Sequence, residues 1–182
     1  MVFRQFKIWL LLVFSLLFFN QCSDFNAIFN GNKRSPKVAK KTPESKKSPA
    51  SSKKNPPYHA KGKFIWPLKA PVTSYYGSRS GGFHEGIDID GKSGDPFVAS
   101  ASGEVVFEGR LGGYGKLIVI KHDHGLFTAY AHNKKNLVHE KQQVKQGQKI
   151  GLVGATGNAQ GDHLHFEVRD ENGHHDPMKF LP

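Results

Sequence analysis

The sequence HLHFEV, residues 163–168, decides the fold of this chain. Successive side chains of a β-strand point to opposite faces, so the three apolar residues would share a buried face and His163, His165 and Glu167 the other. The two imidazoles would lie about 7 Å apart at Cα, so one can bind a metal ion while the other reaches a water molecule on it. Glu167 would either orient a metal-binding imidazole from behind or lie exposed at the strand end.

Short apolar or alternating runs, separated by glycine-rich turns, extend this pattern over residues 64–182. Because apolar residues do not recur at the helical period over any useful length, the runs predict an all-β domain built as a mostly antiparallel sheet. Residues 117–120 are apolar on both faces and predict a central strand. The predicted strands are Gly86–Asp90, Phe97–Ser100, Glu104–Phe107, Lys116–Lys121, Phe127–His132, Lys149–Val153 and Leu164–Arg169.

Two further segments offer metal-binding or proton-transferring side chains. His84 and Asp88 are separated by Gly86, which lets the chain bend so that both side chains can meet one ion. The sequence TAYAH, residues 128–132, is expected to place Tyr130 and His132 on one face of a strand with the alanines behind them. Tyr130 would either line a groove or pack in the core.

Cysteine and charge exclude several functions. The single cysteine, Cys22, excludes a disulfide framework within the chain and a zinc site built on thiolates, whereas ten histidines are available. Residues 1–63 carry 13 Lys and Arg against Asp24 and Glu44, but residues 64–182 carry 13 basic and 13 acidic residues. The predicted domain is therefore neutral and lacks the basic face that nucleic-acid binding requires.

Residues 1–22 are typical of a signal peptide. Basic residues are followed by the apolar run IWLLLVFSLLFF, residues 8–19, which would span about 18 Å as a helix and is short for a bilayer core of about 30 Å. Cys22 directly follows, at a place that resembles the acylated cysteine of bacterial lipoproteins. We expect an exported protein of the cell envelope or periplasm, anchored to a membrane through lipidated Cys22. An uncleaved signal anchor and a secreted protein with an incidental Cys22 are the alternatives.

Residues 23–63 form the predicted linker. They are rich in Lys, Ser and Pro and too poor in apolar residues to offset the entropy of ordering them. We expect a disordered tether that averages about 35 Å end to end. Its lysines would either attract anionic lipids and wall polymers or serve only as a solvated spacer.

Residues 64–182 resemble, in the order and spacing of these motifs, the lysostaphin-type (LytM-like, M23 family) zinc metallopeptidases. The similarity extends through residues 77–122 and 144–169, between and around the motifs. The resemblance implies an antiparallel β fold of the duplicated hybrid motif type with an open groove. It further implies that Zn²⁺ is held by His84, Asp88 and His165, with His132 and His163 beside it as catalytic histidines.

Such a donor set suits hydrolysis. Three protein ligands leave the fourth position of Zn²⁺ for water, which the metal acidifies while it polarises a peptide carbonyl. One of His132 and His163 would take the water proton and pass it to the leaving amine, and the other would stabilise the oxyanion. The sequence leaves these two roles open.

The resemblance implies a zinc metalloendopeptidase that cuts peptides of bacterial peptidoglycan. The scissile bond would lie in a direct D-alanyl cross-link or in a glycine-type bridge, and the lipoprotein-like N-terminus favours the former, in a diderm bacterium. Some family members have lost zinc ligands and instead bind and activate cell-wall amidases, which is the alternative function. A phosphocarrier or lipoyl-like β domain, suggested by the turn at residues 146–151, would leave the His84 and Asp88 pair unexplained. The sequence makes no prediction of oligomeric state.

The remaining residues of interest are assigned structural roles. We expect His122 and His124 at the surface in a hairpin turn, and the pair His174-His175 at the surface in a polar loop. Trp66 and Phe83 are expected to serve packing, in the core or at its rim.

Overall fold

The structure of the protein is a computed structural model, which describes residues 64–182. The predicted signal peptide, Cys22 and the linker lie outside the described residues. Within them the chain is all-β and every strand pairing is antiparallel, as predicted, and the helical segments are three short 3₁₀ turns, Gly112–Tyr114, Asp123–Gly125 and Pro177–Lys179. No helix in this part is long and apolar enough to cross a membrane.

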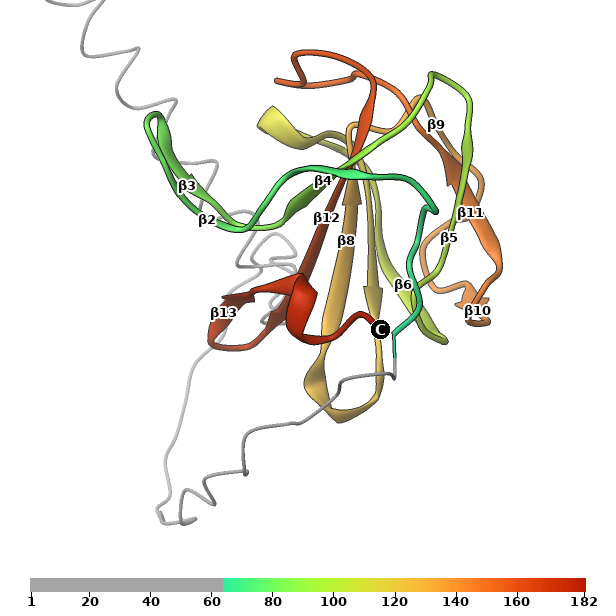
Figure 1. Ribbon diagram of the computed structural model, residues 1–182. Coiled ribbons are helices and arrows are strands. Elements are labelled where there is room, and N and C mark those ends of the chain that lie inside the picture. Colours follow the sequence, from blue (N-terminus) through green and yellow to red (C-terminus); the bar gives the residue numbers. More distant parts are fainter. Residues whose placement is uncertain (1–63) are drawn as a thin grey trace, which may run out of the picture.

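The strands form one large sheet, one small sheet and a hairpin (Figure 1). The large sheet has the order β1 (Val72–Ser74), β4 (Ile87–Asp90), β12 (His163–Asp170), β8 (Phe127–Ala131), β7 (Gly115–Lys121), β6 (Gly103–Leu111) and β10 (Gln143–Val144), and β13 (Gly173–His175) pairs with β12. The small sheet has the order β5 (Pro96–Val98), β11 (Lys149–Leu152) and β9 (Lys135–Asn136). The hairpin of β2 (Gly77–Arg79) and β3 (Gly82–His84) projects to one side.

The main core is shared by the large and small sheets. Phe97 from β5 stacks on Tyr130 from β8 with ring centroids 5.7 Å apart, and Tyr130 also packs against Phe166 from β12. Strand β7 is central, as predicted, and is buried on both faces. Ile118 and Ile120 join the main core, whereas Leu117 joins a second cluster on the opposite face. Burial of these side chains fixes which face of the sheet is left for the polar residues.

The expected arrangement of residues 128–132 is wrong. Tyr130 is fully buried in the core, whereas Ala131 lies on the opposite face and is paired with His165. Strand β8 ends at Ala131, and His132 has a φ of +64°, so it leaves the alternation of the strand. This left-handed conformation brings the His132 ring to the face of the small alanines, where it meets the rings of His163 and His165.

The predicted surface positions of the other histidines hold only for His124, which is exposed. His122 is buried, with Nδ1 2.9 Å from the Ser102 carbonyl oxygen and Nε2 2.7 Å from the Thr128 hydroxyl. Burial lowers the pKa of His122, so its neutral form belongs to the fold. His174 and His175 are half-buried. They lie in β13 and not in a loop, because that strand pairs with β12 and extends the sheet.

Candidate metal centre

The polar face of the large sheet carries His84, Asp88 and His165. Asp88 on β4 and His165 on β12 are directly paired, so their side chains leave the sheet on the same face. His84 ends β3, and the chain bends at Gly86 before β4 begins, as the sequence predicts. A Cβ on Gly86 would lie 2.4 Å from the Phe166 carbonyl oxygen, so glycine is also required for the close approach to β12.

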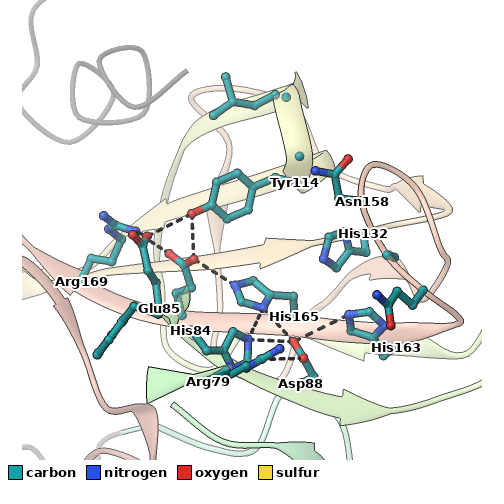
Figure 2. Close-up of a pocket in the computed structure, with 17 residues that line it drawn as sticks. Arg79, His84, Glu85, Asp88, Tyr114, His132, Asn158, His163, His165 and Arg169 are labelled. Carbon is teal, nitrogen blue, oxygen red and sulfur yellow. Dashed lines mark hydrogen bonds and ion pairs between the residues drawn. The ribbon is translucent and has the colours of Figure 1, made fainter. Parts of the chain in front are cut away.

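The three side chains converge on one point (Figure 2). His84 Nε2 lies 3.1 Å from Asp88 Oδ1 and 3.1 Å from His165 Nδ1, and His165 Nδ1 lies 2.8 Å from Asp88 Oδ1. The ligand atoms of a tetrahedral zinc ion lie about 3.3 Å apart, given bonds of about 2.0 Å. Two imidazole nitrogens and one carboxylate oxygen at this spacing fit a zinc ion after a small outward adjustment.

The remaining polar atoms of the trio have partners that fix their orientation. His84 Nδ1 donates to the Tyr75 carbonyl oxygen at 2.9 Å, and His165 Nε2 donates to Glu167 Oε1 at 2.9 Å. These bonds leave His84 Nε2 and His165 Nδ1 as the metal-facing nitrogens. Arg79 lies 3.2 Å from Asp88 Oδ2, which is the carboxylate oxygen turned away from the imidazoles.

The electrostatics of the trio favour a cation. Burial alone would raise the pKa of Asp88, but hydrogen bonds from His165 and His84 hold it well below its usual range. Burial likewise disfavours a charged His165, yet hydrogen bonds to Asp88 and Glu167 outweigh it and raise the pKa of His165 to about 9. A proton or a metal ion on His165 Nδ1 is therefore stabilised by its neighbours, and the two compete for the same nitrogen.

Glu167 orients His165, which confirms one of the two roles predicted for it. The other prediction, an exposed residue at the strand end, is wrong. Its side chain is fully buried, and its second oxygen accepts from Arg169 at 2.8 Å. Hydrogen bonds from His165 and the charge of Arg169 overcome the cost of burial and lower the pKa of Glu167. The carboxylate therefore remains ionised behind the imidazole, and Arg169 also bonds Glu85 at 2.8 Å.

His132 and His163 lie beside the trio, with ring centroids 4.8 Å apart. His132 Nδ1 donates to the Thr156 carbonyl oxygen at 2.8 Å, and His163 Nδ1 donates to the Gly161 carbonyl oxygen at 2.9 Å. In the neutral imidazoles each Nε2 is then an acceptor, and His163 Nε2 lies 3.7 Å from Asp88 Oδ1. Burial lowers the pKa of His132 to about 4, so this ring is neutral at physiological pH.

A cavity of about 580 Å³ opens over all five residues. One wall carries Arg79 from the β2–β3 hairpin, and the opposite wall carries Asn158 from the loop before β12 (Figure 2). The cavity thus presents the metal-facing atoms to solvent between two walls, which is the open groove that the family resemblance implies.

The sequence model of peptidase family M23 matches residues 82–177. This chain belongs to peptidase family M23. The similarity to murein hydrolase activator NlpD of Escherichia coli is 45% identity over 118 residues, which are 64% of this chain and 31% of NlpD. Lipoprotein YgeR of the same organism is 40% identical over 151 residues, 82% of this chain and 58% of YgeR. The chain therefore spans less than two thirds of either relative.

Solved M23 structures share the fold. A zinc-containing peptidase from Vibrio cholerae superposes with a TM-score of 0.60 and 33% identity, over 67% of this chain and 41% of that chain. The family predicted from the spacing of the histidine motifs is thus confirmed. The group of His84, Asp88 and His165 that the family resemblance implies as metal ligands is present as one cluster in the described residues.

The sequence reasoning missed three residues of this M23 site: Arg79, Tyr114 and Arg169. The Tyr114 hydroxyl lies 2.9 Å from Glu167 Oε1, and the Tyr114 carbonyl oxygen accepts the His132 N–H at 2.9 Å. Burial and the nearby carboxylates raise the pKa of Tyr114 well above its ordinary value, so the hydroxyl stays a donor. Residues 112–115 indicated only a glycine-rich turn, and nothing in their spacing pointed to the distant partners.

Proposed function

We propose that this protein is a zinc-dependent endopeptidase that cuts peptides of bacterial peptidoglycan. The observation that carries the proposal is the convergence of three anchored metal-facing atoms, from His84, Asp88 and His165, with two further imidazoles beside them. The zinc content of the Vibrio cholerae relative supports this choice of metal. When bound, Zn²⁺ would supply an acidified water molecule and a polarised carbonyl group.

The proton transfers are assigned to His132 and His163. Both rings are fixed through Nδ1, so each presents Nε2 to the cavity as the atom that exchanges a proton. One of them accepts the proton of the attacking water and delivers it to the nitrogen of the leaving amine. The other would take up a proton from solvent on Nε2 and then donate a hydrogen bond to the oxygen of the tetrahedral intermediate.

The proposed location is the cell envelope, with the domain attached to a membrane through lipidated Cys22. Support comes from the sequence of residues 1–22 and from relatives that are named lipoproteins, such as YgeR. Intact-mass analysis of the membrane-extracted protein tests this, because an unmodified Cys22 in the mature chain would contradict lipidation.

The experiment that tests the proposed activity is mass spectrometry of fragments released from purified peptidoglycan by the full-length, zinc-loaded protein. His163→Ala and a chelator-treated sample serve as controls. We expect new peptide ends with the wild type and none with either control. An absence of release from several wall types by fully zinc-loaded protein would overturn the endopeptidase proposal.

Activation of a separate murein hydrolase is the second candidate, favoured by the 45% identity to NlpD, which is named a murein hydrolase activator. The filled cluster of His84, Asp88 and His165 supports the enzyme instead. The two candidates differ in one outcome: His163→Ala should abolish an endopeptidase but should still stimulate a purified amidase if the protein is an activator.

A further inference from the structure

The cavity contains two arginines in different environments. Arg169 is buried, with a side chain 7% exposed, and bonds two carboxylates, Glu85 and Glu167, at 2.8 Å each. Arg79 has a side chain 43% exposed and, among the described residues, its guanidinium bonds a single oxygen, Asp88 Oδ2, at 3.2 Å. Arg79 is therefore the cation in this cavity that a bound molecule can reach.

The hairpin leaves the Arg79 guanidinium open. Arg79 ends β2 and pairs with Gly82, so no side chain faces it across the hairpin. Gly81 has open space around its Cβ position and no positive φ that would require glycine. Glycine at position 81 is thus required neither by packing nor by the backbone, and with Gly82 it leaves the space next to Arg79 free of a bulky side chain.

The position of Arg79 relative to the reacting centre is defined by Asp88. One oxygen of Asp88 faces the imidazoles of the metal cluster and the other faces Arg79, so a single carboxyl group separates the guanidinium from the metal-facing atoms. A guanidinium has five N–H donors in a planar fork that matches a carboxylate. A carboxylate bound there would lie two or three bonds from an amide that is attacked at the metal cluster.

We propose that Arg79 binds a free carboxylate on the carbon that adjoins the scissile amide nitrogen. This inference rests on the proposed function and deepens it by naming the substrate class. In a direct cross-link, that nitrogen belongs to an amino acid whose own carboxylate can remain free. In a glycine-type bridge, the corresponding carboxyl group is consumed in the next peptide bond. Arg79 therefore selects direct cross-links and C-terminal D-alanyl residues over glycine bridges.

The surrounding charges suit an anionic ligand when a divalent metal ion is bound. Arg169 is shared by Glu85 and Glu167, and Arg79 pairs with Asp88, so two arginines face three carboxylates in the cavity. The formal charge of these five side chains is −1, and a bound Zn²⁺ would change it to +1. The alternative is that Arg79 only holds Asp88 in position. The two roles differ because a positioning role affects all substrates equally, whereas carboxylate recognition affects only substrates that carry the carboxylate.

The test uses acyl-D-alanyl-D-alanine and its C-terminal amide, which have the same scissile bond and differ only in the carboxylate. We expect the full-length, zinc-loaded wild type to prefer the free acid by about 10-fold or more in kcat/KM, mainly through KM, since charge-assisted hydrogen bonds are of this strength. Arg79→Gln should lose the preference. Arg110→Gln changes an exposed arginine outside the cavity and should keep it. Equal cleavage of both peptides by the wild type, or an equal loss on both in Arg79→Gln, would overturn the proposal.

Binding provides a readout that does not need turnover. Calorimetry with zinc-loaded His163→Ala should give tighter binding of the free acid than of the amide, by about 10-fold, and His163→Ala combined with Arg79→Gln should bind both alike. Equal affinities in His163→Ala would overturn the carboxylate site. If the wild type cuts neither murein nor the peptides but the binding preference persists, the proposed hydrolysis fails while the carboxylate site stands.

Discussion

At the scale of single residues, each metal-facing atom has a partner behind it. The Tyr75 carbonyl oxygen holds His84, Glu167 holds His165, and Arg79 holds the far oxygen of Asp88. Ligand orientation is thus decided before a metal binds, which reduces the entropy lost on binding.

The two histidines of the HLH motif should respond differently to truncation. His165→Ala should lose zinc, because it removes one of three metal-facing atoms, whereas His163→Ala should keep zinc and lose turnover by about 100-fold or more. Zinc content after gel filtration, together with peptide cleavage, measures both. Equal zinc loss in the two variants would show that His163 is a ligand.

Glu167→Gln should weaken zinc binding by about 10- to 100-fold, because it removes the charge that supports the His165 imidazole and leaves Arg169 with one carboxylate fewer. The zinc dissociation constant from chelator competition measures this effect. The matched control is Glu104→Gln, at an exposed position on β6 far along the sheet from the cluster. Unchanged affinity in Glu167→Gln would mean that the hydrogen bond to His165 contributes nothing to the site.

At the scale of elements, the site depends on how closely β4 approaches β12. The register that pairs Asp88 with His165 also buries Ile87 opposite Phe166, so the apolar face determines where the metal-facing side chains emerge. The bend at Gly86 places the end of β3 beside this part of the sheet, so that His84 lies next to Asp88 and His165.

Gly86→Ala should therefore damage both fold and site. Its Cβ would lie 2.4 Å from the Phe166 carbonyl oxygen and 2.9 Å from Glu167 Cγ, so β4 and β12 must move apart. We expect a loss of about 1–3 kcal/mol in the free energy of unfolding and weaker zinc binding. Gly81→Ala, at the hairpin tip with nothing within 4 Å, is the matched control and should leave thermal stability unchanged. Identical melting temperatures for the two variants would contradict this account.

At the scale of the whole molecule, a second polar cluster lies in the core away from the cavity. His122 Nε2 meets the Thr128 hydroxyl, which lies 2.9 Å from the Tyr130 hydroxyl, and the Tyr130 hydroxyl accepts the Ser100 N–H. These bonds connect β8 to the end of β7 and to the segment after β5. The cluster satisfies buried hydroxyl groups that would otherwise destabilise the fold.

This cluster makes stability depend on pH. The folded state lowers the pKa of His122, so as pH falls below about 6.5 the unfolded chain takes up a proton that the folded chain resists. Stability should therefore be full above this pH and decrease below it. His122→Asn keeps a donor for the Ser102 carbonyl oxygen. Between pH 7 and pH 5, the free energy of unfolding of this variant should decrease less than that of the wild type. Melting curves of both proteins across this range, taken with chelator present, measure the difference, and parallel pH profiles would argue against it.

Much of the architecture could be predicted because it depends on local alternation. The period of two in residues 163–168 placed β12 correctly with respect to both faces, and the apolar run at 117–120 identified the central strand. His132 could not be placed correctly, because it leaves the strand with a positive φ and its N–H bonds the Tyr114 carbonyl oxygen, which belongs to another element. The partners Tyr114 and Arg169 were missed for the same reason: their contacts depend on register between segments far apart in the sequence.

The metal-facing side chains and the rings of His132 and His163 are oriented by different parts of the chain. Asp88 and His165 sit within paired strands, whereas the rings of His132 and His163 are held by carbonyl oxygens of the loop at residues 154–162. Under the proposed mechanism, we expect a displacement of that loop to disturb proton transfer and to leave metal affinity intact. Zinc content and the proposed peptidase activity should then vary independently, so that a fully zinc-loaded preparation can still be inactive.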